Sequence, residues 1–374
     1  MRVLIVAPSL EREYGGPSKA VLDNKKWLGK YGVKVDIATT YREKTKEYCG
    51  DGIFAFPSSL GNFRYSPKLS RWLDKNITNY DLVQIDTIFH YSTYISSKKA
   101  RMYGIPYVIQ PHGMLEDKLL TSKSRWKKKV FLQLVKDSLD NADAIILTSK
   151  YEEKTCGVKL PKDKFFIQPL GIEVLDEKGK TKIKDFFPEL ENKRIILFLS
   201  RIHPKKGLEI LLHSIGIILR EDKNLALVVA GSGDKAYEDK LKSLVEEEGL
   251  GDSVVFTGFV GGNVKKTLFQ NSVFFILSSH SENFGVAVVE AMSYGLPVLV
   301  SDTVGVADDI LEYNAGLVFK LDKKSIEDSV RKALSNRKLL KRLGVNGKRL
   351  VGDRFHWKKT TPQQIDIYKK IISQ

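Results

Sequence analysis

The stretch that decides the fold is SSHSENFGVAVVEAMSYGLP, residues 278–297. An apolar strand, Val273–Leu277, precedes it, and a helical run is expected from about Val286 until Gly295 and Pro297 end it. The pattern predicts a strand, a tight loop and the start of a helix. Because the first N–H groups of a helix are unpaired and lie at the positive end of its dipole, this arrangement suits a phosphate.

Two carboxylates flank this predicted anion site. Glu282 lies in the loop, and Glu290 falls about one turn inside the helix, roughly 6 Å further along its axis. Ionised carboxylates only accept hydrogen bonds, so both can bind sugar hydroxyls.

The composition is that of an ordinary soluble globular chain of 374 residues, 42% hydrophobic and 28% charged, long enough for two or three domains or one large one. No apolar run approaches the roughly 20 residues of a membrane helix, and the N-terminal MRVLIVAPSLERE predicts a first strand, not a signal peptide. Cys49 and Cys156 are the only cysteines, which favours a reducing cytosol over a disulfide framework or zinc site.

The net charge of +16 is uneven. Residues 1–170 hold 29 Lys+Arg against 18 Asp+Glu, for +11, and residues 171–374 hold 32 against 27, for +5. A strongly basic first half indicates a polyanionic partner, which could be nucleic acid, acidic lipid or a phosphorylated substrate.

Short apolar runs alternate with longer amphipathic stretches, six runs in each half. They are Val3–Ala7, Val35–Thr39, Leu82–Ile85, Tyr107–Gln110, Ala144–Thr148 and Phe165–Gln168, then Ile195–Ser200, Leu225–Ala230, Val254–Thr257, Val273–Leu277, Val298–Val300 and Gly316–Phe319. This alternation predicts two similar doubly wound α/β domains with parallel sheets, whose ligands bind beyond the carboxyl ends of the strands.

The boundary between the domains is expected in the charged segment 173–192, a linker whose second half could form a short helix. Near the C-terminus, the spacing of apolar residues in Pro362–Ser373 predicts an amphipathic helix.

Basic residues follow the first strand of the second half. Ser200–Gly207 reads SRIHPKKG, so Arg201 and Lys206 would reach over the strand end, where cations suit a diphosphate. By itself such a loop is usually solvated surface. Its place in the same half as Glu282 and Glu290 favours the binding site.

Two features of the first half are also candidates. The adjacent Gly15 and Gly16 after the first strand would let the backbone approach a ligand, or form an ordinary strand-to-helix turn. His112, in QPHGML just past a strand, is placed for a ligand, although a structural histidine is the competing interpretation. There is no GxGxxG fingerprint, no common metal spacing of histidines and no Asp-x-Asp, so neither a dinucleotide site nor a required divalent metal is expected.

A basic segment, SKSRWKKKVFLQLVK at residues 122–136, repeats apolar residues every four positions at Trp126, Val130 and Leu134. Such a helix can lie on an anionic membrane, or pack its apolar face inside the domain while its lysines are solvated.

SRIHPKKG followed by SENFGVAVVEAMSYGLPV resembles the retaining GT-B glycosyltransferases of group 1, family 4, whose signature is Glu-x7-Glu. The resemblance covers essentially the whole chain, including GGPS near the start, and the QPHGM portion looks most like enzymes that build bacterial surface polysaccharides. It implies an α/β GT-B fold with two Rossmann-like doubly wound domains facing a central cleft. Residues 1–172 would bind the acceptor and residues 193–357 the donor, with 173–192 as linker and a C-terminal helix, about 358–374, crossing back to the first domain.

The resemblance also implies roles for single residues. Arg201 and Lys206 would hold the donor diphosphate, and the backbone of Asn283, Phe284 and Gly285 would contact phosphate and sugar. Glu282 would bind the donor sugar and Glu290 the ribose. From the first domain, Gly15 and Gly16 would contact the phosphates, and His112 would approach the donor sugar. The donor would be a UDP- or GDP-sugar, with no cofactor or metal, and transfer would retain the anomeric configuration.

The expected acceptor is a glycan or a polyprenyl-diphosphate-linked sugar, reached from the cytoplasm at an anionic membrane surface through the basic N-terminal domain. Nucleic acid is not expected, because no recognised binding motif accompanies the charge. A nucleotide-sugar 2-epimerase on the same fold, and a non-catalytic nucleotide-sugar-binding protein, stay as alternatives.

Overall fold

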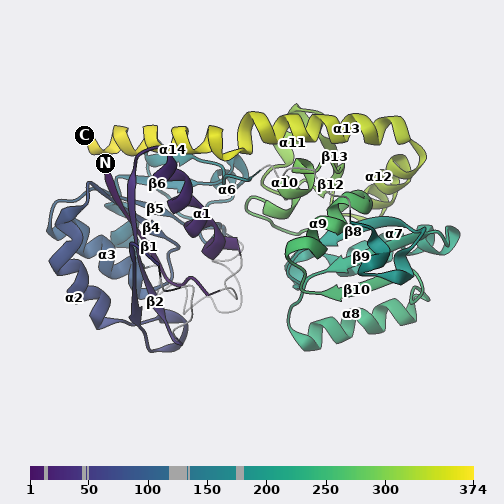
Figure 1. Cartoon of the computed structure of the whole chain (residues 1–374), viewed down its shortest axis with the longest axis horizontal. Helices are drawn as coiled ribbons and strands as arrows, with labels where there is room; N and C mark the ends of the chain where they lie inside the picture. The colour runs from purple at the N-terminus through teal and green to yellow at the C-terminus, as the bar shows by residue number, and fades with distance from the viewer. Residues whose placement is uncertain (12–15, 44–47, 49, 118–132, 134, 174–180) are drawn as a thin grey trace. The chain divides into compact units, whose positions relative to one another are not determined.

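The computed structural model describes residues 1–11, 16–43, 48, 50–117, 133, 135–173 and 181–374. These residues form two compact units: Met1–Gly171 together with Trp357–Gln374, and Ile172–His356 (Figure 1). Each unit is a parallel sheet flanked by helices.

The sheet of the first unit has seven strands in the order β3-β2-β1-β4-β5-β6-β7, all paired in parallel. They are β1 Arg2–Ala7, β2 Lys34–Tyr41, β3 Ile53–Pro57, β4 Leu82–Asp86, β5 Tyr107–Gln110, β6 Ala144–Leu147 and β7 Phe165–Ile167. The helices are α1 Gly16–Lys30, α2 Pro67–Asn76, α3 Tyr91–Met102, α6 Lys150–Lys154 and α14 Trp357–Ile372.

The sequence prediction of six strands in this half is wrong, because it missed β3. That strand lies at the edge of the sheet, and none of its five residues is fully buried. Its first four residues, IFAF, are nevertheless an apolar run between Gly52 and Pro57, so the local pattern could have found it. The first helix begins at Gly16, directly in the predicted glycine turn.

Two hydrophobic clusters cover the two faces of this sheet. One of them joins Val3 and Ile5 of β1 to Ile365, Tyr368 and Ile371 of α14. The expected return of the C-terminal helix to the first domain is therefore confirmed.

The second unit has the six predicted strands, ordered β10-β9-β8-β11-β12-β13 and all parallel. They are β8 Arg194–Leu199, β9 Leu225–Ala230, β10 Val254–Gly258, β11 Ser272–Leu277, β12 Val298–Ser301 and β13 Gly316–Phe319. The helices are α7 Leu208–Glu221, α8 Lys235–Glu247, α9 Gly262–Asn271, α10 Val286–Ser293, α11 Ala307–Glu312, α12 Lys323–Ser335 and α13 Arg337–Leu350.

The chain passes between the units at 171–172 and again at 356–357. On the side of the second unit the two crossings are joined, because Ile172 N donates to Phe355 O at 2.7 Å. Short helical turns at Ile183–Asp185 and Pro188–Leu190 occupy the second half of the expected linker, and a π-helical segment, Val351–Phe355, leads from α13 to α14.

Candidate functional site

The switch point of the second sheet lies between β8 and β11, where the strand order reverses. In open parallel sheets, ligands bind beyond the carboxyl ends of the strands at this point. The loop after β8 carries Arg201 and Lys206, and the loop after β11 carries Glu282 to Gly285, so the fold brings both predicted motifs to one edge.

Hydrogen bonds join these two loops. His280 N donates to Lys205 O at 2.8 Å, and Ser279 Oγ donates to the same oxygen at 3.0 Å. Gly207 ends the β8 loop at φ 67°, and a Cβ there would lie 2.0 Å from Ser278 O. Only glycine fits both the left-handed backbone and this close approach, so the glycine of SRIHPKKG fixes the spacing of the loops.

The charged groups of this edge meet in an ion pair between Lys206 Nζ and Glu282 Oε2. The Lys206 and Glu282 side chains are 14% and 21% exposed, so the pair remains open to solvent. A third loop supports Glu282, because its N–H donates to Thr303 O at 3.0 Å and its carbonyl accepts from Gly305 N at 2.8 Å. Arg201 is exposed, and within the described residues its guanidinium makes no ion pair.

Glu290 is the fifth residue of α10, and its Oε2 lies 2.5 Å from Lys265 Nζ of α9. Gly285, at φ 96°, precedes the helix and turns the chain into it. The Phe284 ring is buried edge-to-face against Phe355, with ring centroids 5.4 Å apart. At this position, therefore, only the backbone is available to a ligand.

The pKa of His203 indicates that the electrostatic potential at this edge is positive. Partial burial and the cations Arg201, Lys206 and Lys205 lower this pKa below its usual value. A neighbourhood that disfavours another positive charge favours an anion.

A second group of polar residues lies at the carboxyl edge of the first sheet. His112 follows β5 at φ 51°, and its nearly buried Nε2 lies 3.5 Å from Asp86 Oδ2 at the end of β4. Burial by itself would lower the pKa of His112, but the facing Asp86 carboxylate, with a smaller effect from Glu152, raises it above its usual value. The Asp86 carboxylate thus stabilises the protonated form of the imidazole more than burial destabilises it.

Glu152 fixes the loop that carries His112. Its carboxylate accepts Gly113 N–H at 2.5 Å, Thr148 N–H at 2.7 Å and Thr148 Oγ1–H at 2.9 Å. These three donors compensate for burying the charge.

A chain of buried side chains connects Asp86 to α14. Gln84 Nε2 donates to Asp86 Oδ1 at 2.8 Å, while Gln84 Oε1 accepts from Gln364 Nε2 at 3.2 Å and from the Tyr368 hydroxyl. The C-terminal helix therefore helps to position Asp86, the residue that faces His112.

A cavity of about 20 Å³ lies beside this network, lined by Ala20, Val21, Asn24, Asp86, Gln110, His112, Gln168, Pro169, Leu170, Gly171, Trp357 and Gln364. A space of this size holds about one water molecule. Asp86, Gln364 and His112 of the network are among its lining residues.

Of the predicted site residues, the structure gathers Arg201, Lys206, Glu282 to Gly285 and Glu290 at one edge of the second unit, and it places His112 in the first unit. Gly16 is the first residue of α1, and Gly15 lies outside the described residues, as does most of the basic segment 122–136. The sequence analysis missed Lys265, Thr303, Asp86 and Glu152. Asp86 could have been found, because it ends a buried strand next to the one before His112.

Among the described residues no three His, Cys, Asp or Glu side chains are grouped as they would be to hold a metal ion. In the same part of the chain, no helix is both long and apolar enough to cross a bilayer.

Two family profiles match the chain and together span most of it. The family described as "Glycosyl transferases group 1" matches residues 179–350, and "Glycosyltransferase Family 4" matches residues 14–174. The chain belongs to the group 1, family 4 glycosyltransferases. It is a glycosyltransferase with the GT-B fold that the Glu-x7-Glu pattern predicted.

Individual relatives agree with this family. The chain is 26% identical over 302 residues to an uncharacterized glycosyltransferase of Methanocaldococcus jannaschii, covering 78% of this chain and 76% of the relative. It is 26% identical over 314 residues to alpha-monoglucosyldiacylglycerol synthase of Streptococcus pneumoniae, covering 80% and 70%.

Solved structures share the fold. HepE of Anabaena in complex with UDP superposes with a TM-score of 0.79 at 15% identity, covering 99% of this glycosyltransferase and all of HepE. Sucrose-phosphate synthase of Thermosynechococcus elongatus gives 0.77 at 20% identity, covering 100% and 99%.

Proposed function

We propose that this glycosyltransferase moves a sugar from a nucleoside-diphosphate sugar to a hydroxyl of a lipid-linked glycan, with retention of configuration and without a divalent metal. The observation that carries the proposal is the group of Arg201, Lys206 and Glu282 at the switch point of the second sheet. Two cations and a helix start suit the diphosphate, and the carboxylates suit the hydroxyls of the sugar and ribose.

The leaving group of such a transfer is a nucleoside diphosphate, which gains negative charge as the glycosidic bond breaks. Arg201 and Lys206 would stabilise that charge, as would the N–H groups at the start of α10. Preorganised donors of this kind typically contribute about 3–4 kcal/mol each to the transition state.

Glu282 would accept hydrogen bonds from donor-sugar hydroxyls and Glu290 from the ribose. Each carboxylate already has a lysine partner, Lys206 and Lys265 respectively. These pairs orient the carboxylates. For His112 the resemblance implies a place beside the donor sugar, and that role stays a prediction.

The nucleotide-sugar donor is supported by HepE, whose structures contain UDP and UDP-glucose. Both UDP and GDP remain open for this chain. A lipid-linked acceptor is supported by the basic first half and by the relative named alpha-monoglucosyldiacylglycerol synthase. Work at the inner face of the cytoplasmic membrane follows from that acceptor.

The test is product analysis in EDTA. The protein is incubated with an α-linked UDP- or GDP-sugar and a prenyl-diphosphate-linked sugar, and the new linkage is assigned by NMR. We expect an α-linked product whose yield EDTA does not reduce. A β-linked product, or activity that EDTA abolishes and Mg²⁺ restores, would overturn the corresponding part of the proposal.

The same incubation without acceptor separates the epimerase alternative. An isomerase would convert the nucleotide sugar alone, whereas a transferase leaves it intact or hydrolyses it slowly.

A further inference from the structure

The helix α13 of the second unit carries a surface of one charge. Its exposed residues are Arg337, Lys338, Lys341, Arg342, Val345, Lys348 and Arg349, and its sequence contains no Asp or Glu. At 3.6 residues per turn these positions share one side of the helix, within an arc of about 140°. The opposite side, with Leu340, Leu343 and Leu350, is buried in the unit. We call the exposed side the α13 basic face.

The α13 basic face is unusual within its own unit. From residue 171 to 336 the chain has 21 Lys+Arg and 25 Asp+Glu, a net charge of −4, whereas residues 337–356, the rest of the unit, have seven against one, a net charge of +6. The neighbouring helix α12 is also amphipathic, but Glu327 and Asp328 interrupt its basic residues. Among the described helices of the second unit, α13 carries the most cations, six Lys and Arg with no acidic residue.

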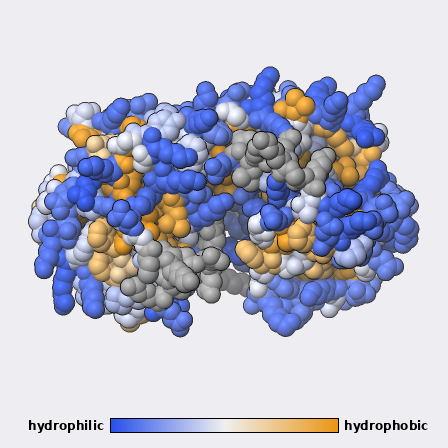
Figure 2. Space-filling view, in the orientation of Figure 1, coloured by the Kyte–Doolittle hydropathy of each residue, from blue (hydrophilic) through white to orange (hydrophobic). Residues whose placement is uncertain are grey.

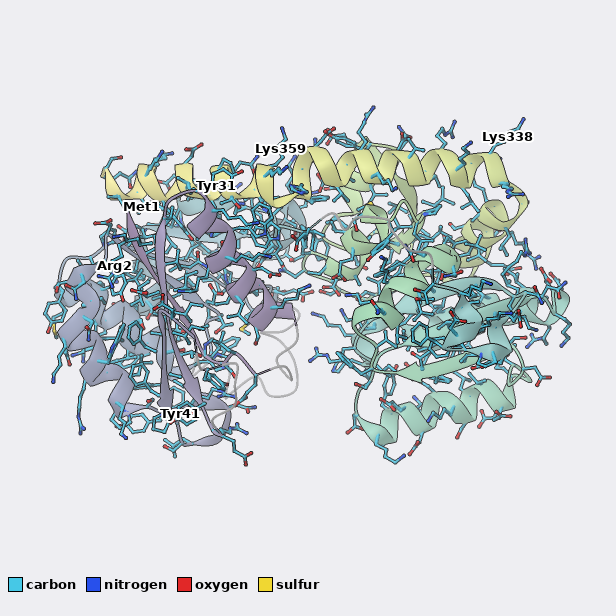
Figure 3. The ribbon with its side chains drawn as sticks, viewed as in Figure 1. Met1, Arg2, Tyr31, Tyr41, Lys338 and Lys359 are labelled. Carbon is cyan, nitrogen blue, oxygen red and sulfur yellow. The ribbon has the colours of Figure 1, made fainter. Side chains whose placement is uncertain are left out.

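Four of these cations are available to a partner. Arg337, Lys338, Lys341 and Arg342 are exposed, and they form no ion pair within the described residues. Lys338 projects outward at the start of the helix (Figure 3). Figure 2 shows mainly hydrophilic side chains along the edge of the molecule where α13 runs. Leaving several like charges side by side is unfavourable unless an anionic surface compensates them.

The single apolar residue of the face, Val345, indicates which kind of anionic partner would bind there. Val345 is 62% exposed and lies near the middle of the arc, between Lys341 and Lys348. One exposed valine is ordinary by itself. Surrounded by six cations it gives the arrangement that suits a bilayer, where an apolar side chain enters the interface and lysines meet lipid phosphates.

We propose that the α13 basic face binds the anionic surface of a membrane. The choice of lipid over another polyanion rests on the proposed lipid-linked acceptor. The surface lies on the second unit, so it is separate from the basic segment 122–136 of the first. It would add attraction for the membrane without using any residue of the Arg201–Glu290 site.

The test compares two variants that lose the same charge. The first, Lys338→Gln with Lys341→Gln and Arg342→Gln, neutralises three cations of the face. The control, Lys323→Gln with Lys324→Gln and Lys332→Gln, neutralises three exposed lysines of α12. Each protein is floated with vesicles of equal parts phosphatidylglycerol and phosphatidylcholine, and with phosphatidylcholine alone.

We expect the wild type to float only with the anionic vesicles, less so at high salt. The partition coefficient should fall on the order of 100-fold in the α13 variant, because each cation near an anionic surface contributes about a factor of five. The control should stay within a few-fold of the wild type. Equal losses in both variants, or no loss in the α13 variant, would overturn the proposal, as would a wild type that binds no vesicles.

A gain of binding separates lipid from nucleic acid. Val345→Leu adds one methylene group, which should raise the vesicle partition coefficient about fourfold and leave binding to a short DNA duplex unchanged. Duplex binding as tight as vesicle binding, lost in the same α13 variant, would show a general polyanion surface and reject the membrane.

Nucleotide titration of the same variants keeps this proposal apart from the proposed function. The α13 variant should bind nucleotide like the wild type. If the α13 variant binds nucleotide normally and floats like the wild type, only the membrane-binding proposal is overturned. If none of the proteins binds nucleotide, the result counts against the proposed transferase site.

Discussion

The polar groups at the carboxyl edges of the two sheets differ in burial and in how they are held in place. In the second unit the functional groups are charged and partly exposed, and the Lys206–Glu282 ion pair stays within reach of solvent. In the first unit, His112 and Asp86 are nearly buried, with Gln84, Gln364 and Tyr368 behind them. A partly exposed ion pair contributes little stability, so a diphosphate can take over its lysine at low cost. A buried network is costly to disturb, so it holds one side chain in one place.

The largest expected effect is on turnover in the second unit. Arg201→Ala and Lys206→Ala should each lower kcat on the order of 100- to 1,000-fold, because each removes a cation that stabilises the leaving diphosphate. Initial rates at saturating donor would measure this loss. Lys235→Ala, an exposed lysine of α8, is the matched control and should keep its activity.

Thermal melting of the same proteins tests whether the charged groups of the second unit contribute to stability. Arg201→Ala should melt like the wild type, since its side chain is exposed. Near-normal turnover in both variants would remove the assignment of the diphosphate site.

The next effect is on the first unit, through Asp86→Asn. The wild-type His112 has a raised pKa, so its contribution to stability is fully present below the ordinary histidine value of 6.5 and is lost as pH rises through the folded value. In the variant burial remains, opposed only by the smaller effect of Glu152, so the pKa falls and stability should instead decrease as pH drops below about 6.5.

Urea unfolding at pH about 5.5 and about 8 would measure this reversal. We expect a loss of about 1–3 kcal/mol near the lower pH, the range for an uncompensated buried polar group. A variant whose stability keeps the wild-type dependence on pH would show that Asp86 does not control His112.

A smaller effect is expected where α14 meets the network. Tyr368→Phe removes the hydroxyl that donates to Gln84 and accepts from Gln364, and it should destabilise the protein by about 1–2 kcal/mol. Tyr31→Phe, at an exposed tyrosine, should change stability by less than about 0.5 kcal/mol. Equal urea midpoints for the two variants would mean that the buried chain adds nothing.

A small effect on stability is also expected for Glu282→Gln. Losing one partner of a partly exposed ion pair should cost less than about 1 kcal/mol, even though donor use should fall clearly. Thermal melting beside initial rates would show both. A large loss of stability in Glu282→Gln would mean that Glu282 stabilises the fold as the buried network around Asp86 does. The proposed difference between the two sheet edges would then be wrong.

The sequence predicted the parts of this molecule whose pattern is local. Residues 273–297 read as strand, loop and helix, and they form β11, the loop and α10. The apolar spacing near the C-terminus likewise predicted α14. Both signals come from periodicity within a single element.

Two kinds of feature were not predicted from the sequence. One depends on contacts between residues far apart in the chain, and the other was hidden because net charge was counted over a whole half of the chain. Lys265 pairs with Glu290 from another helix, and Thr303 supports Glu282 from a third loop; neither spacing is visible along the chain. Comparing charge by halves also concealed α13, because the net +5 of residues 171–374 is the sum of −4 over 171–336 and +9 over 337–374, of which α13 contributes +6. Strand β3 is an exception, because its apolar run Ile53–Phe56 is visible in the sequence.

The measurement that tests the central claim most directly is calorimetric titration of UDP, GDP and ADP and their common sugar conjugates in EDTA, against the wild type, Glu290→Ala and Lys235→Ala. The account predicts micromolar, metal-free binding of one nucleotide family, about tenfold or more weaker in Glu290→Ala and unchanged in Lys235→Ala. Binding that Glu290→Ala leaves intact, or no binding of any nucleotide to the wild type, would contradict the assignment of the second unit as the donor site.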